Sequence, residues 1–168
     1  RCRTETALAK PARLRRRDAR FGRLSHTLKK PFPPGLDTAL ALDPANPPAL
    51  VGKGRALAML DRPVEAAVSF DQALQAEPRN RETWVRKGIV LDMMGRFDEA
   101  IACFEEALAI EARDASAWFN LGITLLNTSE FEEAVKAFDQ ALAIDPRDAE
   151  AYYNRGVALL DLKKYEKA

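Results

Sequence analysis

Few side chains of the 168-residue chain have the chemistry that catalysis or metal binding needs. The single histidine, His26, has no cysteine or carboxylate at the spacing of a metal-ligand pair, so we interpret it as solvated. Cys103 stands beside Phe104 on the apolar stripe of an expected helix, which favours a buried thiol over a nucleophile. Acid pairs such as Glu105–Glu106 are typical of solvated helix faces. The sequence therefore predicts no catalytic residue, no metal site and no cofactor.

Charge divides the chain into two parts. Residues 1–35 contain 11 Lys and Arg and two acids (11 − 2 = +9), whereas residues 36–168 contain 15 Lys and Arg and 23 acids (15 − 23 = −8). The basic part could contact nucleic acid, although we regard this partner as the less expected one. It could instead contact the acidic part of this or another chain. The favoured interpretation is a degenerate repeat or a poorly structured lead-in without a dedicated partner.

A period of 34 residues runs through residues 36–168. Several residue types recur at this spacing: Gly54, Gly88, Gly122 and Gly156; Ala66, Ala100, Ala134 and Ala168; Phe70, Phe104 and Phe138; Trp84, Trp118 and Tyr152; and Pro44, Pro78 and Pro146. A fixed period of this length indicates a repeat architecture. Ala112 takes the place of proline in one copy, and we expect the helix before it to run a little further there.

Two amphipathic helices are predicted in each repeat, and residues 115–127 and 131–144 show the pattern best. Asn46, Asn80, Asp114 and Asp148 stand where the first helix of each repeat should be capped. The glycine of the first helix and the alanine of the second lie 12 positions apart. We expect them to face each other, so that two antiparallel helices approach closely. One such pair buries too little by itself, so stability must be shared between stacked pairs.

The motif W-x2-L-G at Trp118, followed by Ala134, Phe138, Ala141 and Pro146, resembles the tetratricopeptide repeat. The resemblance covers residues 47–168. It implies an all-α, right-handed superhelix (solenoid) of antiparallel helix pairs with a concave groove, whose members bind peptides or proteins. The expected repeats are 47–80, 81–114, 115–148 and a truncated repeat at 149–168, preceded by the end of another repeat from residue 36. The truncated repeat should expose Tyr152, Leu159 and Leu162 unless something covers them.

The resemblance also implies which first-helix residues line the groove. These are Val51, Arg55, Met59, Val85, Arg86, Ile89, Met93, Phe119, Asn120, Ile123, Asn127, Tyr153, Asn154 and Val157, with Asp161 at one end. The surface they form is largely apolar, as interaction sites often are. Several of these residues could instead pack between repeats. Some relatives grip the terminal carboxylate of a peptide with a clamp of Lys and Asn side chains. Neither of two alignments completes that clamp: one keeps an Asn and some positive charge, and the other places an acid where a base is needed. The clamp positions are Val51, Arg55, Arg86, Ser116 and Asn120 in the first alignment, and Val85, Ile89, Asn120, Glu150 and Asn154 in the second.

The sequence thus predicts a non-catalytic, cytoplasmic scaffold that binds a peptide or protein segment in its groove. Two alternatives remain open: a structural module that self-associates through open repeat ends, and the interaction arm of a larger enzyme. A membrane partner is not expected, because no run of 18 apolar residues occurs.

Overall fold

The computed structural model describes residues 35–165. The regular secondary structure of this range consists of α-helices joined by short turns. The helices are α2 (Leu36–Leu42), α3 (Pro47–Met59), α4 (Pro63–Ala76), α5 (Arg81–Met93), α6 (Phe97–Ile110), α7 (Ala115–Asn127), α8 (Phe131–Ile144) and α9 (Ala149–Tyr165). None of these helices is long and apolar enough to cross a membrane. The expectations for the basic residues 1–34, including His26, lie outside the described residues, as does the one for Ala168.

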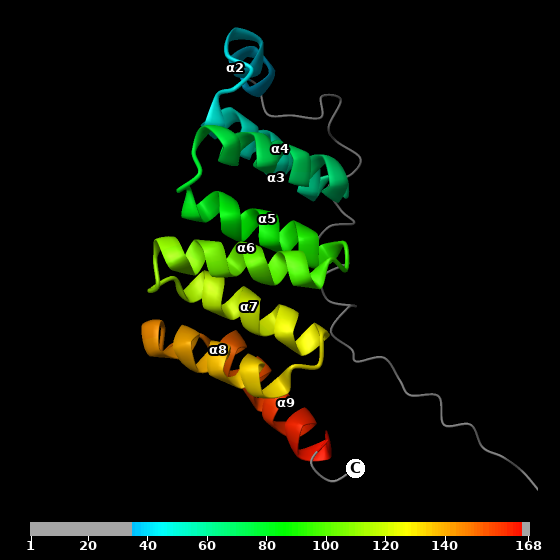
Figure 1. Cartoon of the computed structure of the whole chain (residues 1–168), viewed down its shortest axis with the longest axis vertical. Helices are drawn as coiled ribbons and strands as arrows, with labels where there is room; N and C mark the ends of the chain where they lie inside the picture. Colours follow the sequence, from blue (N-terminus) through cyan, green and yellow to red (C-terminus); the bar gives the residue numbers. More distant parts are fainter. Residues whose placement is uncertain (1–34, 166–168) are drawn as a thin grey trace, which may run out of the picture. The chain divides into compact units, whose positions relative to one another are not determined.

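The helices form pairs that follow one another along the chain (Figure 1). Helices α3 and α4, α5 and α6, and α7 and α8 pack together, and each second helix also packs on the first helix of the next pair. Each complete pair starts 34 residues after the one before it, at Pro47, Arg81 and Ala115. The prediction of an all-α solenoid built from 34-residue helix pairs is confirmed.

Every first helix begins at the predicted cap. The side-chain oxygen of Asn46 accepts a hydrogen bond from the backbone N–H of Ala49 at 3.0 Å, and that of Asn80 accepts one from Thr83 at 3.1 Å. Asp114 and Asp148 each accept two such bonds, at 2.9–3.1 Å. These bonds satisfy N–H groups that have no partner inside the helix, so they fix where the helix starts.

The turn inside each pair is also repeated. Asp61, Gly95 and Ser129 stand in one column, and each has a left-handed backbone, with φ of 58°, 74° and 68°. The next residue in each copy donates its N–H to a leucine carbonyl near the end of the first helix, at 2.9–3.0 Å. Three different residue types thus adopt the same left-handed backbone conformation in this turn, although only glycine does so without steric cost.

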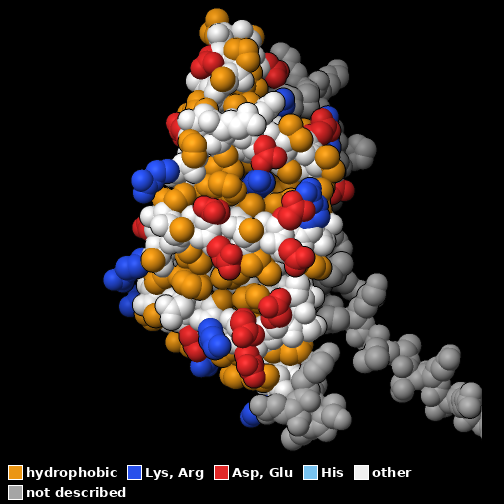
Figure 2. Space-filling model, in the orientation of Figure 1, with side chains coloured by type: hydrophobic (Ala, Val, Ile, Leu, Met, Phe, Trp, Pro, Cys, Tyr) orange, Lys and Arg blue, Asp and Glu red, His pale blue; other side chains and the backbone are white. Residues whose placement is uncertain are grey.

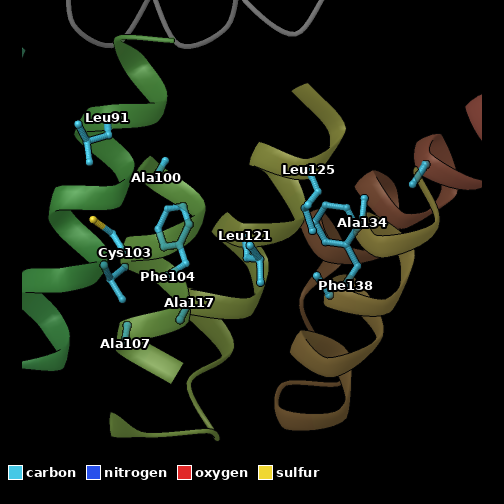
Figure 3. Packing of buried hydrophobic residues seen from close by; sticks show 13 residues of the cluster. Leu91, Ala100, Cys103, Phe104, Ala107, Ala117, Leu121, Leu125, Ala134 and Phe138 are labelled. Atoms are coloured by element: carbon cyan, nitrogen blue, oxygen red, sulfur yellow. The ribbon is translucent and has the colours of Figure 1, made fainter. Parts of the chain in front are cut away.

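The close approach of the two helices brings a phenylalanine ring of the second helix against the glycine of the first. A Cβ atom placed on Gly54, Gly88 or Gly122 would lie 2.6–2.7 Å from a ring carbon of the phenylalanine 16 residues later. The rings of Phe104 and Phe138 are buried in the main hydrophobic cluster, shown in Figure 3. The glycine leaves room for a large ring from the second helix, so the glycine and phenylalanine columns form one packing unit.

The missing proline at Ala112 does not lengthen the helix before it, so the prediction there was wrong. Helix α6 has 14 residues, as α4 and α8 do, and a turn of the same form follows each of them. Two contacts beyond the turn are also the same. Trp118 Nε1 donates to the carbonyl of Ala112 at 2.9 Å, as Trp84 Nε1 does to Pro78, and Asp114 caps the next helix. These contacts and the next helix keep the joint in place without proline.

Helix α9 differs from the other first helices. It has 17 residues where α3, α5 and α7 have 13, so it continues through Lys163, the position of the turn in the other repeats. Leucine and lysine are good helix formers, and Lys163 lacks the strained φ found in the other three copies. Tyr152 is more than half exposed, as expected, whereas Leu159 and Leu162 are half-buried.

Candidate partner-binding surface

The predicted groove residues form three columns, and each first helix contributes one residue to every column. They are Val51, Val85, Phe119 and Tyr153; Arg55, Ile89, Ile123 and Val157; and Met59, Met93, Asn127 and Asp161. Within one helix the three positions are four residues apart, which places them on one side. We call these residues, together with the adjoining Arg86, Asn120 and Asn154, the first-helix face. The residues of the first-helix face come from helices α3, α5, α7 and α9.

The predicted residues differ widely in exposure. Arg55, Met59, Met93, Asn127 and Tyr153 are exposed. The half-buried residues are Val51, Arg86, Ile89, Phe119, Asn120, Ile123 and Val157. Met59 is 56% exposed and Met93 is 42% exposed. Exposing an apolar side chain to water is unfavourable, so a partner that covers these methionines would gain free energy. The first-helix face therefore has an accessible apolar part at the carboxyl ends of α3 and α5.

Two predicted groove residues are buried and do not present their side chains to a ligand. Val85 is only 6% exposed and belongs to the main hydrophobic cluster. Asn154 is 5% exposed, and its side-chain amide donates to the carbonyl of Glu150 at 2.9 Å. The column pattern places both on the first-helix face, but the structure buries both. We therefore leave both out of the surface proposed below.

Phe119 and Ile123 are shared between surface and core. The ring of Phe119 meets that of Phe138 edge to face, with centroids 5.9 Å apart and an angle of 62° between the ring planes. Ile89 and Ile123 pack against the same hydrophobic cluster. Packing into the hydrophobic core thus accounts for part of this apolar column. Substituting Phe119 would disturb the fold together with any binding.

Sequence reasoning missed one polar contact between repeats on this side of the molecule. Asp92 accepts hydrogen bonds from Thr124 Oγ1 at 2.9 Å and from Asn127 Nδ2 at 3.1 Å. The other three repeats have Ala58, Leu126 and Leu160 at this position. A single charged residue in an otherwise apolar column is the signal that could have revealed it. Its contacts join α5 to α7 and occupy the Asn127 amide.

Two arginines of the first-helix face, Arg55 on α3 and Arg86 on α5, differ in their contacts with acids. Arg86 donates from Nε to Glu82 at 2.9 Å, and this hydrogen bond and the charge of Arg86 lower the pKa of Glu82. The positive charge of Arg55 adds to that effect from a distance. Arg55 itself makes no hydrogen bond or ion pair with any residue in the range 35–165. An exposed arginine that makes no ion pair within residues 35–165 therefore lies one helical turn from Met59.

We next consider whether the described residues include a reactive thiol or a metal site. Burial raises the pKa of the Cys103 thiol from 9.0 to about 11, as expected for a thiol inside the core. No group of three or more His, Cys, Asp or Glu residues in the described part of the chain is arranged to hold a metal ion. Two hollows lie at the joints between helices, one lined by Gly95 and Thr128 and the other by Pro78 and Asn80. On the side shown in Figure 2, hydrophobic patches alternate with charged side chains.

Stacked pairs of this kind, with short turns and a repeated glycine–phenylalanine contact, define a helical-repeat protein. The chain belongs to the tetratricopeptide repeat family, whose sequence profile matches residues 36–81, 85–149 and 122–168.

Three solved structures illustrate the likeness. MamA has 22% identity and a TM-score of 0.71, over 79% of this chain and 72% of its own. YrrB, described as a TPR protein with an unusual peptide-binding site, has 30% identity and a TM-score of 0.66, over 79% of this chain and 68% of its own. The first TPR domain of Spaghetti (RPAP3), bound to the HSP90 peptide SRMEEVD, has 20% identity and a TM-score of 0.69, over 72% of this chain and 96% of its own. A search of curated protein sequences gives no match.

Proposed function

We propose that the chain is a non-catalytic scaffold that binds a peptide or protein segment on the first-helix face. The observation that carries this proposal is the exposure of Met59 and Met93, which stand in one column on α3 and α5. Flexible thioether side chains adapt to irregular apolar partners and are frequent at binding surfaces. An amphipathic helix or an extended segment could cover them.

The relatives support a peptide as the ligand class. The RPAP3 domain is solved with a bound peptide, and the YrrB structure is described by its peptide-binding site. The present chain would have to bind differently from a carboxylate clamp. The clamp positions of its first three repeats hold Val51, Arg55, Arg86, Ser116 and Asn120, which supply too few aligned donors.

The magnitude of the apolar contribution follows from the exposed fractions. The uncovered parts of Met59 and Met93 together amount to about one whole methionine side chain. Burying one such side chain contributes roughly 1.5–3 kcal/mol, which corresponds to roughly 10- to 150-fold in affinity. Met59→Gln with Met93→Gln should therefore weaken a bound segment by at least about tenfold. Both side chains are exposed, so the fold should be unaffected.

The test uses linear peptides selected from a random display library on the immobilised chain. Affinities are then measured in solution by fluorescence polarisation. The matched control is Val64→Gln with Val68→Gln, because these valines of α4 are 61% and 52% exposed but lie on a second helix. We expect the methionine pair to lose binding and the valine pair to retain it. Equal effects of the two pairs, or no effect of the methionine pair, would overturn the proposal.

A further inference from the structure

We infer that the segment bound by the first-helix face carries an acidic side chain beside a large apolar one, and that the acid meets Arg55. This inference rests on the proposed function and specifies the chemistry of its ligand. It requires a cation that is free to take a new partner, apolar surface next to it, and no competing acid.

Arg55 meets the first requirement. It is exposed and has no hydrogen bond or ion pair within residues 35–165. Several other arginines of the described chain are held by carboxylates: Arg62 by Glu65, Arg96 by Glu99, Arg81 by Glu111 and Asp114. Arg79, Arg113 and Arg147 have no ion pair within residues 35–165 either, but they lie in the turns between helices and not on the first-helix face. A guanidinium presents several N–H donors in a planar fork that suits a carboxylate. No carboxylate of residues 35–165 is hydrogen-bonded to the donors of Arg55.

The second requirement concerns the neighbours of Arg55. Met59 lies four residues further along α3, on the same side of the helix. Met93 holds the same column position on α5, and α3 and α5 are in direct contact. A carboxylate that reaches Arg55 would therefore bring its flanking residues over exposed apolar surface. An acid followed by a large apolar residue about one helical turn away fits this arrangement.

The nearby acids are engaged. Glu82 is bound by Arg86, and the amide and hydroxyl partners of Asp92 lie on α7. Arg86 is hydrogen-bonded to Glu82, the acid whose pKa the charge of Arg55 also lowers. Of the two arginines on the first-helix face, Arg55 is therefore the one without an ion pair within residues 35–165. A single arginine between methionines suits an acidic, apolar peptide. A nucleic acid would need a row of cations along its phosphates, and the acids on α5 would oppose it.

The experiment is a charge exchange between protein and peptide. A display-selected peptide is measured on the unaltered chain and on Arg55→Glu, first as selected and then with its acid changed to lysine. The control variant is Arg147→Glu, which makes the same charge change at an exposed position in the turn before α9. Circular dichroism confirms that each variant is folded.

We expect Arg55→Glu to weaken the selected peptide by about fivefold or more, the upper range for an exposed ion pair. The lysine peptide should bind the unaltered chain weakly and regain affinity on Arg55→Glu, whereas Arg147→Glu should change neither. Selected peptides without acids, or a loss that Arg55→Glu does not reverse, would overturn the inference. If those peptides still depend on Met59 and Met93, the proposed function stands while the assignment of Arg55 fails.

Discussion

The packing of glycine against phenylalanine predicts opposite effects for one substitution at two equivalent positions. In Gly88→Ala the new Cβ would lie 2.7 Å from Cε1 and 2.8 Å from Cζ of Phe104. Because that ring is fully buried in the main cluster, it has no free space to move into. In Gly156→Ala the new Cβ would meet nothing within 4 Å.

The magnitude has two parts. Replacing glycine by alanine inside a helix stabilises it by about 1 kcal/mol, and this gain applies at both positions. Overpacking costs about 1–3 kcal/mol, and it applies only at Gly88. The difference between the two variants should therefore be about 1–3 kcal/mol, with Gly88→Ala the less stable. Gly156→Ala should be as stable as the unaltered chain or more so.

Urea unfolding followed by circular dichroism measures both free energies. A third comparison introduces Gly88→Ala into a Phe104→Leu background, where the smaller side chain leaves room for the methyl group. The cost of the alanine should shrink or change sign there, because the two positions are in contact. Equal stabilities of the two alanine variants, or an unchanged cost in the leucine background, would refute the packing argument.

Four further predictions follow from single residues. Ala112→Pro should raise stability by about 0.4–1 kcal/mol in urea unfolding, because Glu111 already has the extended backbone (φ −143°, ψ 99°) that precedes proline; a clear loss would contradict this. Ser129→Gly should stabilise by about 0.5–1 kcal/mol in the same assay, because it relieves the left-handed φ of 68°. Thr83→Ala should leave stability unchanged or higher, because the buried hydroxyl has no hydrogen-bond partner among the described residues; a loss above about 1 kcal/mol would show that its methyl group matters more. Native Cys103 should react with iodoacetamide at pH 8 far more slowly than the unfolded chain, as measured by peptide mass spectrometry. Burial raises the pKa of Cys103 from 9.0 to about 11, so the unfolded chain ionises first and folding stability should fall as the pH rises from about 9 towards about 11.

The sequence predicted the fold well because its signals are local and repeated. Asn80 and Asp114 cap helices wherever the chain places them, and the 34-residue spacing reports a packing unit that occurs several times. The Ala112 prediction failed because proline is only one of several contacts that hold the joint. The Trp118 indole reaches the same carbonyl whichever residue stands there.

The surface was harder to predict than the fold. A column position gives the direction of a side chain but not what lies above it. Val85 and Met93 both stand on the first-helix face, yet Val85 is buried in the main hydrophobic cluster and Met93 is exposed. Whether Arg55 is paired also depends on residues far away in the sequence. These properties arise from packing between repeats, so one repeat considered alone does not contain them.

The most direct test of the first-helix face follows the methyl groups of the methionines by NMR. The chain has three, Met59, Met93 and Met94. Met94 is half-buried and packs against the cluster around Leu57 and Phe70, so it serves as an internal control. When a display-selected peptide is titrated in, the signals of Met59 and Met93 should shift together in a saturable way while that of Met94 stays in place. Saturable binding that leaves the Met59 and Met93 signals unmoved would contradict the proposal that the first-helix face is the binding surface.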